Sequence, residues 1–130
     1  ADEYQAKKLV MQIQKFEKSG GLTTTAGYFM YKPLFGSTKT QWSYPNGWAP
    51  LHMIVVEGLE KYGYKNEAER VAIKWLKTCN DWYKNTGHFQ EKYNVVSTKQ
   101  NPTNGLYPSQ TGFGWTNGVF TNLANKYLPK

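Results

Sequence analysis

Apolar residues recur along the chain at spacings of three and four, which is the period of a helix with one buried face. Four such segments are separated by stretches rich in glycine, proline and aromatic residues, and they predict helices over residues 2–18, 50–62, 66–85 and 116–127. The positions expected to face inward are, in chain order, Leu9, Val10, Ile13 and Phe16; Leu51, Ile54, Val55, Gly58 and Leu59; Ala68, Val71, Ala72, Trp75, Leu76, Cys79 and Trp82; and Val119, Phe120, Leu123 and Tyr127.

Turn-forming residues mark the ends of these helices. Gly63 and Gly87 follow the second and third helices, where glycine is the usual residue. Pro50 suits the first turn of the second helix, and Asn66 is expected to cap the third. Only residues 93–96 are a candidate strand. The sequence therefore predicts an all-α chain of helix hairpins.

The connections between the helices are long and carry large aromatic side chains. Residues 22–40 form a stretch of 19 without evident structure, and such loops in compact domains are usually functional. The next segment, QWSYPNGWAP at 41–50, holds two tryptophans, a tyrosine and no charge. Aromatic rings in loops are costly unless they are buried or receive a ligand. Residues 88–115 form a second long connection, so a binding face is expected on the loop side of the helices.

Length, charge and the placement of single residues argue against a multidomain, nucleic-acid-binding, membrane-spanning or metal-binding protein. With 130 residues the chain fits one domain, 1–130. The net charge of +7 is spread along the sequence without a nucleic-acid motif, so the lysines are interpreted as solvated and no nucleic-acid partner is expected. The longest apolar run is far too short for a membrane span. Cys79 is expected to be a buried thiol. His52 and His88 are isolated, so we predict no metal and no cofactor.

Three stretches, in order, resemble conserved segments of trehalases, the glycoside hydrolases of α,α-trehalose. QWSYPNGWAP (41–50) resembles a Gln-Trp-Asp-x-Pro segment, EKYNV (91–95) the segment with the catalytic base, and QTGFGWTNGVF (110–120) the C-terminal motif. SGGLTTT (19–25) resembles a Gly-Gly segment further upstream. The resemblance covers nearly the whole chain and implies the last third of the family's (α/α)6 toroid, in which helix hairpins surround a sugar pocket.

The resemblance also implies a reaction. Inverting glycosidases use one carboxylic acid to protonate the glycosidic oxygen and one carboxylate to activate water. Glu91 corresponds to the family's base, whereas the acid is an Asp in a part of the family barrel that this chain does not match. We therefore expect a second chain or segment that completes the barrel, or self-association, and we expect the chain alone to be inactive.

Four residues of the motifs are candidates for binding trehalose or a related saccharide. Trp42 is expected to cover an apolar sugar face. Gln41 and Asn46 either orient sugar hydroxyls or hold the loop. Trp115 either lines the pocket or packs beneath it, while Trp48 is expected to pack in the core.

Two positions depart from the family pattern and leave a second function open. Ser43 stands where the family has Asp, and Leu106 where it has Glu, so two carboxylates near the expected pocket are missing; residues 27–38 also look like an insertion. Glu91 beside Lys92 is open to a second interpretation as a solvated ion pair. The alternative function is a catalytically inactive, trehalase-derived carbohydrate-binding or structural protein.

Overall fold

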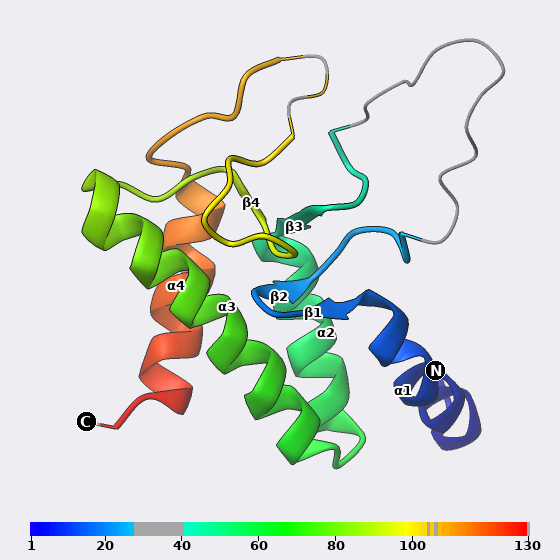
Figure 1. The fold of residues 1–130 in the computed structure, drawn as a ribbon. Helices are drawn as coiled ribbons and strands as arrows, with labels where there is room; N and C mark the ends of the chain where they lie inside the picture. Colours follow the sequence, from blue (N-terminus) through cyan, green and yellow to red (C-terminus); the bar gives the residue numbers. More distant parts are fainter. Residues whose placement is uncertain (28–40, 104, 106, 130) are drawn as a thin grey trace, which may run out of the picture.

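The computed structural model describes residues 1–27, 41–103, 105 and 107–129 (Figure 1). Helices dominate this part of the chain, as predicted, and short strands join their ends. The helices are α1 (Glu3–Phe16), α2 (Ala49–Lys61), α3 (Lys65–Thr86) and α4 (Gly114–Tyr127). The strands are β1 (Glu17–Lys18), β2 (Gly21–Leu22), β3 (Asn46–Trp48) and β4 (Lys92–Asn94).

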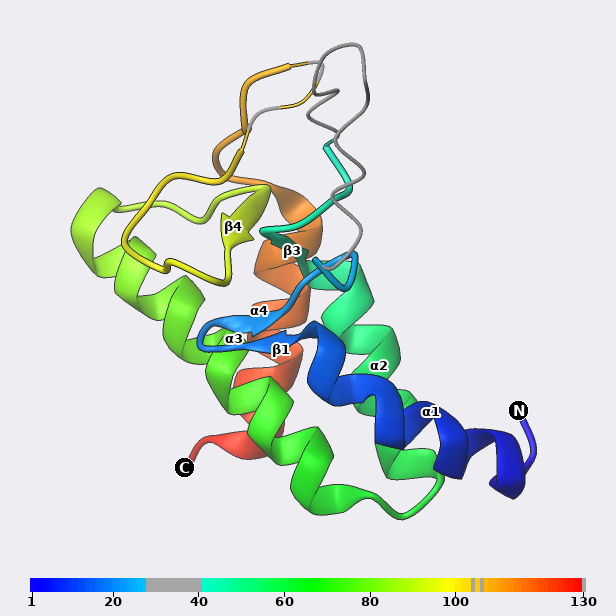
Figure 2. The ribbon, with the colours of Figure 1, turned by 45° about the vertical axis from the view of Figure 1, so that its right-hand side comes forward.

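Helices α2 and α3 form a hairpin, and α4 packs against both (Figure 1). Helix α1 lies beside α2 on the side away from α4 (Figure 2). The connections that precede α2 and α4 gather at one end of the helices, as expected from the sequence (Figure 1). No helix in the described ranges is long and apolar enough to cross a membrane.

The core lies where α2, α3 and α4 meet the β3–β4 pair. Trp75 of α3 is fully buried at its centre, with the His52 ring stacked on it at 4.0 Å and the Tyr93 ring edge-on at 5.3 Å. Cys79 is buried there as a free thiol, as predicted. The remaining buried apolar residues of this cluster are Leu22, Ala49, Val56, Leu59, Ala68, Val71, Ala72, Leu76, Val95 and Leu123.

The start of α3 corrects one expectation. The helix begins at Lys65, so Asn66 lies inside it, and the cap position is held by Tyr64 without a side-chain hydrogen bond. The turn is set by the backbone instead. Gly63 adopts a left-handed φ of 81°, and the Tyr64 N–H donates to the Leu59 carbonyl at 2.9 Å. The turn at Gly63 and Tyr64 therefore starts α3 one residue before Asn66, and Asn66 does not act as the N-cap.

The strands were mostly missed because they are two or three residues long. The candidate at 93–96 overlaps β4, which ends at Asn94 and pairs antiparallel with β3 in the register Asn46↔Asn94. Gly47 of β3 packs so tightly that a Cβ there would lie 2.7 Å from the Leu22 carbonyl oxygen. Such an approach requires glycine, and it ties β3 to the β1–β2 hairpin.

Helix α1 is held mainly at its C-terminal end. Glu17, the residue after α1, accepts two hydrogen bonds from the Arg70 guanidinium at 2.8 and 3.0 Å and one from Lys74 at 2.8 Å. The Arg70 hydrogen bonds, aided by Lys74, hold the pKa of the Glu17 carboxyl below its usual range against the opposing effect of burial. This charged anchor fixes the end of α1 to α3. Near the other end of α1, the Tyr62 hydroxyl, just after α2, donates to the Ala1 carbonyl.

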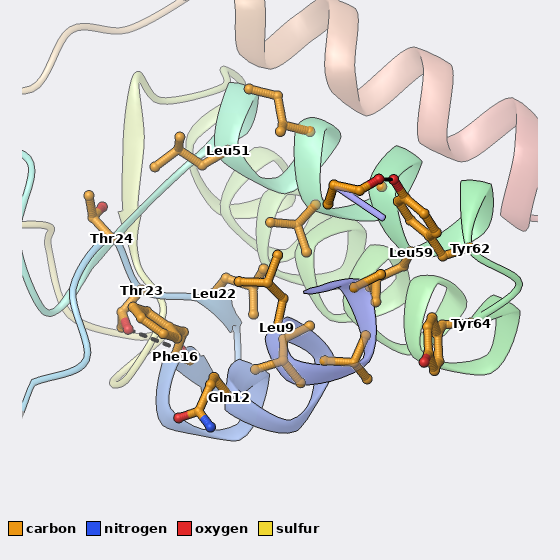
Figure 3. Close-up of a pocket in the computed structure, with 17 residues that line it drawn as sticks. Leu9, Gln12, Phe16, Leu22, Thr23, Thr24, Leu51, Leu59, Tyr62 and Tyr64 are labelled. Carbon is orange, nitrogen blue, oxygen red and sulfur yellow. Dashed lines mark hydrogen bonds between the residues drawn. The ribbon is translucent and has the colours of Figure 1, made fainter. Parts of the chain in front are cut away.

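An apolar groove lies between α1 and α2, with a volume of about 490 Å³ (Figure 3). Leu9 and Ile54, both expected to face inward, line it with 64% and 65% of their surface exposed. Their predicted burial is wrong for this chain. The helix periodicity is correct, since Ala6 is buried and Val10 and Ile13 pack against the core, but Leu9 and Ile54 lie on the open side of the groove.

Candidate functional site

The sequence motifs meet at the loop end of the helices, around the β3–β4 pair. Strand β3 places Trp48 opposite Lys92 of β4, and α2 starts directly after Trp48. The Gln41–Trp42 pair precedes β3, and Glu91 precedes β4. Two motifs that are about 50 residues apart in sequence are thereby adjacent in space.

The backbone around Glu91 is fixed by the third motif. The Glu91 N–H donates to the Gln110 carbonyl at 2.8 Å, and Gln90 pairs with Thr111 in an isolated bridge. The Thr116 hydroxyl, in the first turn of α4, donates to the Gln90 carbonyl at 2.8 Å. These contacts bury Glu91 at the start of β4.

Both carboxylate oxygens of Glu91 have a hydrogen-bond donor. The Tyr107 hydroxyl donates to Oε1 at 2.9 Å, and the Lys92 ammonium lies 3.1 Å from Oε2. The side chains of Glu91 and Lys92 are both buried, so the interpretation of a solvated ion pair is wrong. The hydrogen bond to Glu91 raises the pKa of the Tyr107 hydroxyl, with a smaller opposing effect from the Gln41 amide. Sequence reasoning considered Lys92 only as the partner of Glu91 in a solvated pair, and it missed Tyr107.

Three tryptophans form a stacked cluster beside this carboxylate. Trp42 stacks on Trp48 with centroids 3.7 Å apart and planes 6° from parallel, and Trp115 meets both rings edge-on at 6.1 and 5.6 Å. Trp48 is fully buried, as predicted, whereas Trp42 and Trp115 expose 44% and 38% of their surface. The cluster therefore has a rigid base and two rings that present aromatic surface to solvent.

The two predicted amides hold loops. Asn46 is buried, and its side chain accepts from the Thr103 N–H and donates to the Thr103 carbonyl, both at 3.0 Å. The Gln41 Oε1 accepts from the Gly105 N–H at 2.7 Å. Its amide nitrogen lies near the Tyr107 hydroxyl but makes no hydrogen bond of good geometry with the described residues. The hydrogen bonds of both side chains thus hold loops, while a contact of either residue with a sugar stays a prediction.

His52 closes the underside of the site. Its Nε2 accepts from the Leu22 N–H at 2.7 Å, which leaves Nδ1 to donate to the Trp48 carbonyl at 2.8 Å. Burial lowers the pKa of His52 to about 4, against a smaller opposing effect of the Trp48 carbonyl. The imidazole is therefore neutral and links β2, β3 and α2. Among the residues that the structure describes, no His, Cys, Asp and Glu side chains group as metal ligands.

The departures from the family pattern fall in two places. Ser43 lies beside Trp42, and its carbonyl accepts from the Asn46 N–H at 2.9 Å. Leu106 lies outside the described residues, as does nearly all of the insertion-like stretch at 27–38. The structure thus brings together all five predicted site residues, Gln41, Trp42, Asn46, Glu91 and Trp115, around the β3–β4 pair.

Comparisons with known proteins agree with the motifs. The trehalase family model matches residues 1–127. A probable trehalase of Oryza sativa subsp. japonica is 38% identical over 97% of this chain and 22% of its own length. A periplasmic trehalase of Citrobacter koseri is 40% identical over 85% of this chain and 18% of its own length.

A solved structure shows the same fold. The neutral trehalase of Saccharomyces cerevisiae superposes on the whole chain with a TM-score of 0.72 and 32% identity, over 22% of its own chain. The chain therefore spans about a fifth of the length of the relatives it matches, where the resemblance had implied a third.

Proposed function

The chain belongs to the trehalase family, and from this premise we propose that it is the segment of a trehalase-like glycoside hydrolase that carries the general base, Glu91. The observation that carries the proposal is the Glu91 carboxylate itself. It is buried, hydrogen-bonded at both oxygens, and joined through Lys92 and Trp48 to the exposed rings of Trp42 and Trp115.

The proposed reaction is the inverting hydrolysis of α,α-trehalose or a related saccharide. An ionised Glu91 accepts a proton from a water molecule, which attacks the anomeric carbon on the face opposite the leaving group. A carboxylic acid across the sugar protonates the glycosidic oxygen. The two groups need about 6.5–9.5 Å between them to leave room for the water. In this proposal the acid comes from the part of the barrel outside this chain.

The aromatic cluster would bind the sugar. Pyranose rings have apolar C–H faces, which flat aromatic surfaces cover well. Trp42 and Trp115 offer such surface, while Trp48 stacks behind Trp42 and keeps its ring in place. The Gln41 amide nitrogen is a donor for a sugar hydroxyl, because the described residues give it no well-formed hydrogen bond. Asn46 acts indirectly by holding the loop.

The groove between α1 and α2 supports the proposed need for a partner. It is lined by aliphatic side chains from both helices, and large exposed apolar surfaces usually mark an interface. We propose that another segment of a trehalase-like barrel, on the same or a second chain, covers this surface. Self-association of the chain is the alternative occupant.

The proposal is tested in the longest native polypeptide or assembly that contains the chain. Glu91→Gln keeps the shape of the side chain and removes the base, so we expect glucose release from α,α-trehalose to fall by at least about 10²-fold. Glu57→Gln, an exposed position on α2, is the matched control and should leave the rate unchanged. Normal activity of Glu91→Gln would exclude the proposed base.

The stereochemistry gives a second test. Inversion releases one β-glucose for each α-glucose, which early NMR spectra distinguish from the α-only product of retention. The expected spectrum shows both anomers in equal amounts before mutarotation. Release of α-glucose alone would contradict the proposed inverting mechanism, in which Glu91 activates water for a single displacement.

Ser43 favours the second candidate function, an inactive carbohydrate-binding protein. It supplies a hydroxyl beside Trp42 where the family has a carboxylate. In that case the native assembly would bind trehalose without hydrolysing it. Calorimetric titration with trehalose, followed by a glucose assay of the same sample, separates the two functions.

A further inference from the structure

Lys92 occupies an unusual position for a lysine. Neighbouring residues of a strand point to opposite faces, yet the Glu91 and Lys92 side chains meet. They can do so because Glu91 lies in a bend, and β4 begins only at Lys92. The Lys92 side chain is fully buried opposite Trp48.

The surroundings of the Lys92 ammonium contain one anion and two aromatic rings. Its Nζ lies 3.1 Å from Glu91 Oε2, 5.5 Å from the centre of a Trp48 ring and 5.7 Å from the Tyr107 ring. Aromatic faces attract cations at these distances. The titratable groups that the described structure places against this ion pair are Glu91, Lys92 and Tyr107.

A role in packing alone does not need this charge. A buried ion pair costs desolvation energy on both partners, and apolar side chains of similar size often replace such pairs without loss of stability. The geometry instead serves Glu91: Tyr107 holds one carboxylate oxygen and Lys92 the other, so both ends of the carboxylate are fixed in orientation. Trp48 links Lys92 to the exposed ring of Trp42.

We infer that Lys92 is a positioning residue for the candidate base, which orients the Glu91 carboxylate by holding one of its two oxygens. This inference rests on the proposed function of Glu91. It assigns Lys92 no contact with the saccharide. Its effect should therefore appear in turnover more than in substrate binding.

The test compares Lys92→Met, Lys92→Arg and the exposed control Lys99→Met in the native assembly. Lys92→Met should lower kcat by about 10-fold or more, within the range attributed to a well-placed base, and leave KM nearly unchanged. Lys92→Arg should recover most of kcat, because it restores a cationic donor to the carboxylate, and Lys99→Met should match the unmodified protein.

Other outcomes distinguish the positioning role of Lys92 from the proposed role of Glu91 as the base. If Glu91→Gln abolishes hydrolysis while Lys92→Met retains kcat, the positioning role is overturned and the proposed base stands. If Glu91→Gln retains activity, the proposed base itself falls, and the inference about Lys92 falls with it.

A double-mutant cycle on thermal stability tests the pairing without any activity. Lys92→Met should change the melting temperature differently in the Glu91 and Glu91→Gln backgrounds, because the partner charge is absent in the second. Equal changes in the two backgrounds would overturn the pairing. If Lys92→Met does not fold, Lys92→Gln replaces it in both experiments, with circular dichroism as the check on folding.

Discussion

The two ends of the α2 helix differ in how their surfaces are completed. At its N-terminus, polar and aromatic residues from distant segments bury one another: Glu91, Lys92 and Trp48 are almost inaccessible to solvent although two of them carry charge. Further along α2, facing α1, the surface is mainly aliphatic although Gln12, Thr23 and Thr24 also line it. Leu9 and Ile54 remain largely exposed there. The more hydrophobic region is thus the less buried one.

This contrast shows that burial in the chain follows specific pairing more than hydrophobicity. The loop end is closed by strand register, a neutral histidine and an ion pair, all supplied by the chain itself. The groove has apolar surface but no facing element among the described residues to cover it. The candidate site should therefore be rigid in the chain by itself, while the groove should tolerate change.

The largest expected effect on stability comes from removing Trp48, which lies at the centre of the buried loop end of the helices. Trp48→Ala deletes a fully buried ring that stacks on Trp42 and lies over Lys92, so the free energy of unfolding should fall by about 3–5 kcal/mol. Urea denaturation followed by circular dichroism measures this loss. Trp42→Ala is the matched control, and its partly exposed ring should cost much less. Equal losses would mean that the loop end is not a closed core.

The second expected effect is a dependence of the free energy of unfolding on pH, caused by His52. Its pKa of about 4 lies below the ordinary value of 6.5, so folding favours the neutral ring. The stabilisation, roughly 3 kcal/mol for such a difference, is fully present above pH 6.5 and is lost as the pH falls towards 4. Urea denaturation at pH 7.5, 5.5 and 4.5 should show this decline. It should be much smaller in His52→Gln, and an unchanged decline in that variant would assign the pH dependence to other groups.

The smallest expected effect concerns the groove. Leu9→Ser and Ile54→Ser change side chains that are about two-thirds exposed, so each should alter the free energy of unfolding by no more than about 0.5 kcal/mol. Urea denaturation of the chain measures it, with the buried Leu59→Ser as the control that should be strongly destabilising. A large loss for Leu9→Ser would show that α1 closes on α2 in solution, and the contrast between the two regions would disappear.

Much of the fold and of the candidate site was accessible from sequence. The four helices follow from periodicity, with ends displaced by up to two residues, because such periodicity depends only on local spacing. Burial of Cys79 and Trp75 was predicted correctly for the same reason, and burial of Trp48 was predicted from its place at the start of a helix. The motif residues Gln41, Trp42 and Trp115 could be grouped through the family resemblance, and the structure brings them together.

What the sequence by itself determined is the set of amphipathic helices, the loop side that carries the aromatic residues, and the trehalase family to which the motifs belong. Only the tertiary structure decided which of these surfaces are closed. Lys92 is buried against Glu91 because the backbone bends at Glu91. The hydrogen bonds of Asn46 to the Thr103 loop and the neutral state of His52 depend on partners that are distant in sequence. Local spacing cannot encode such partners, because hydrogen bonds and desolvation depend on distances in space and not on distances along the chain.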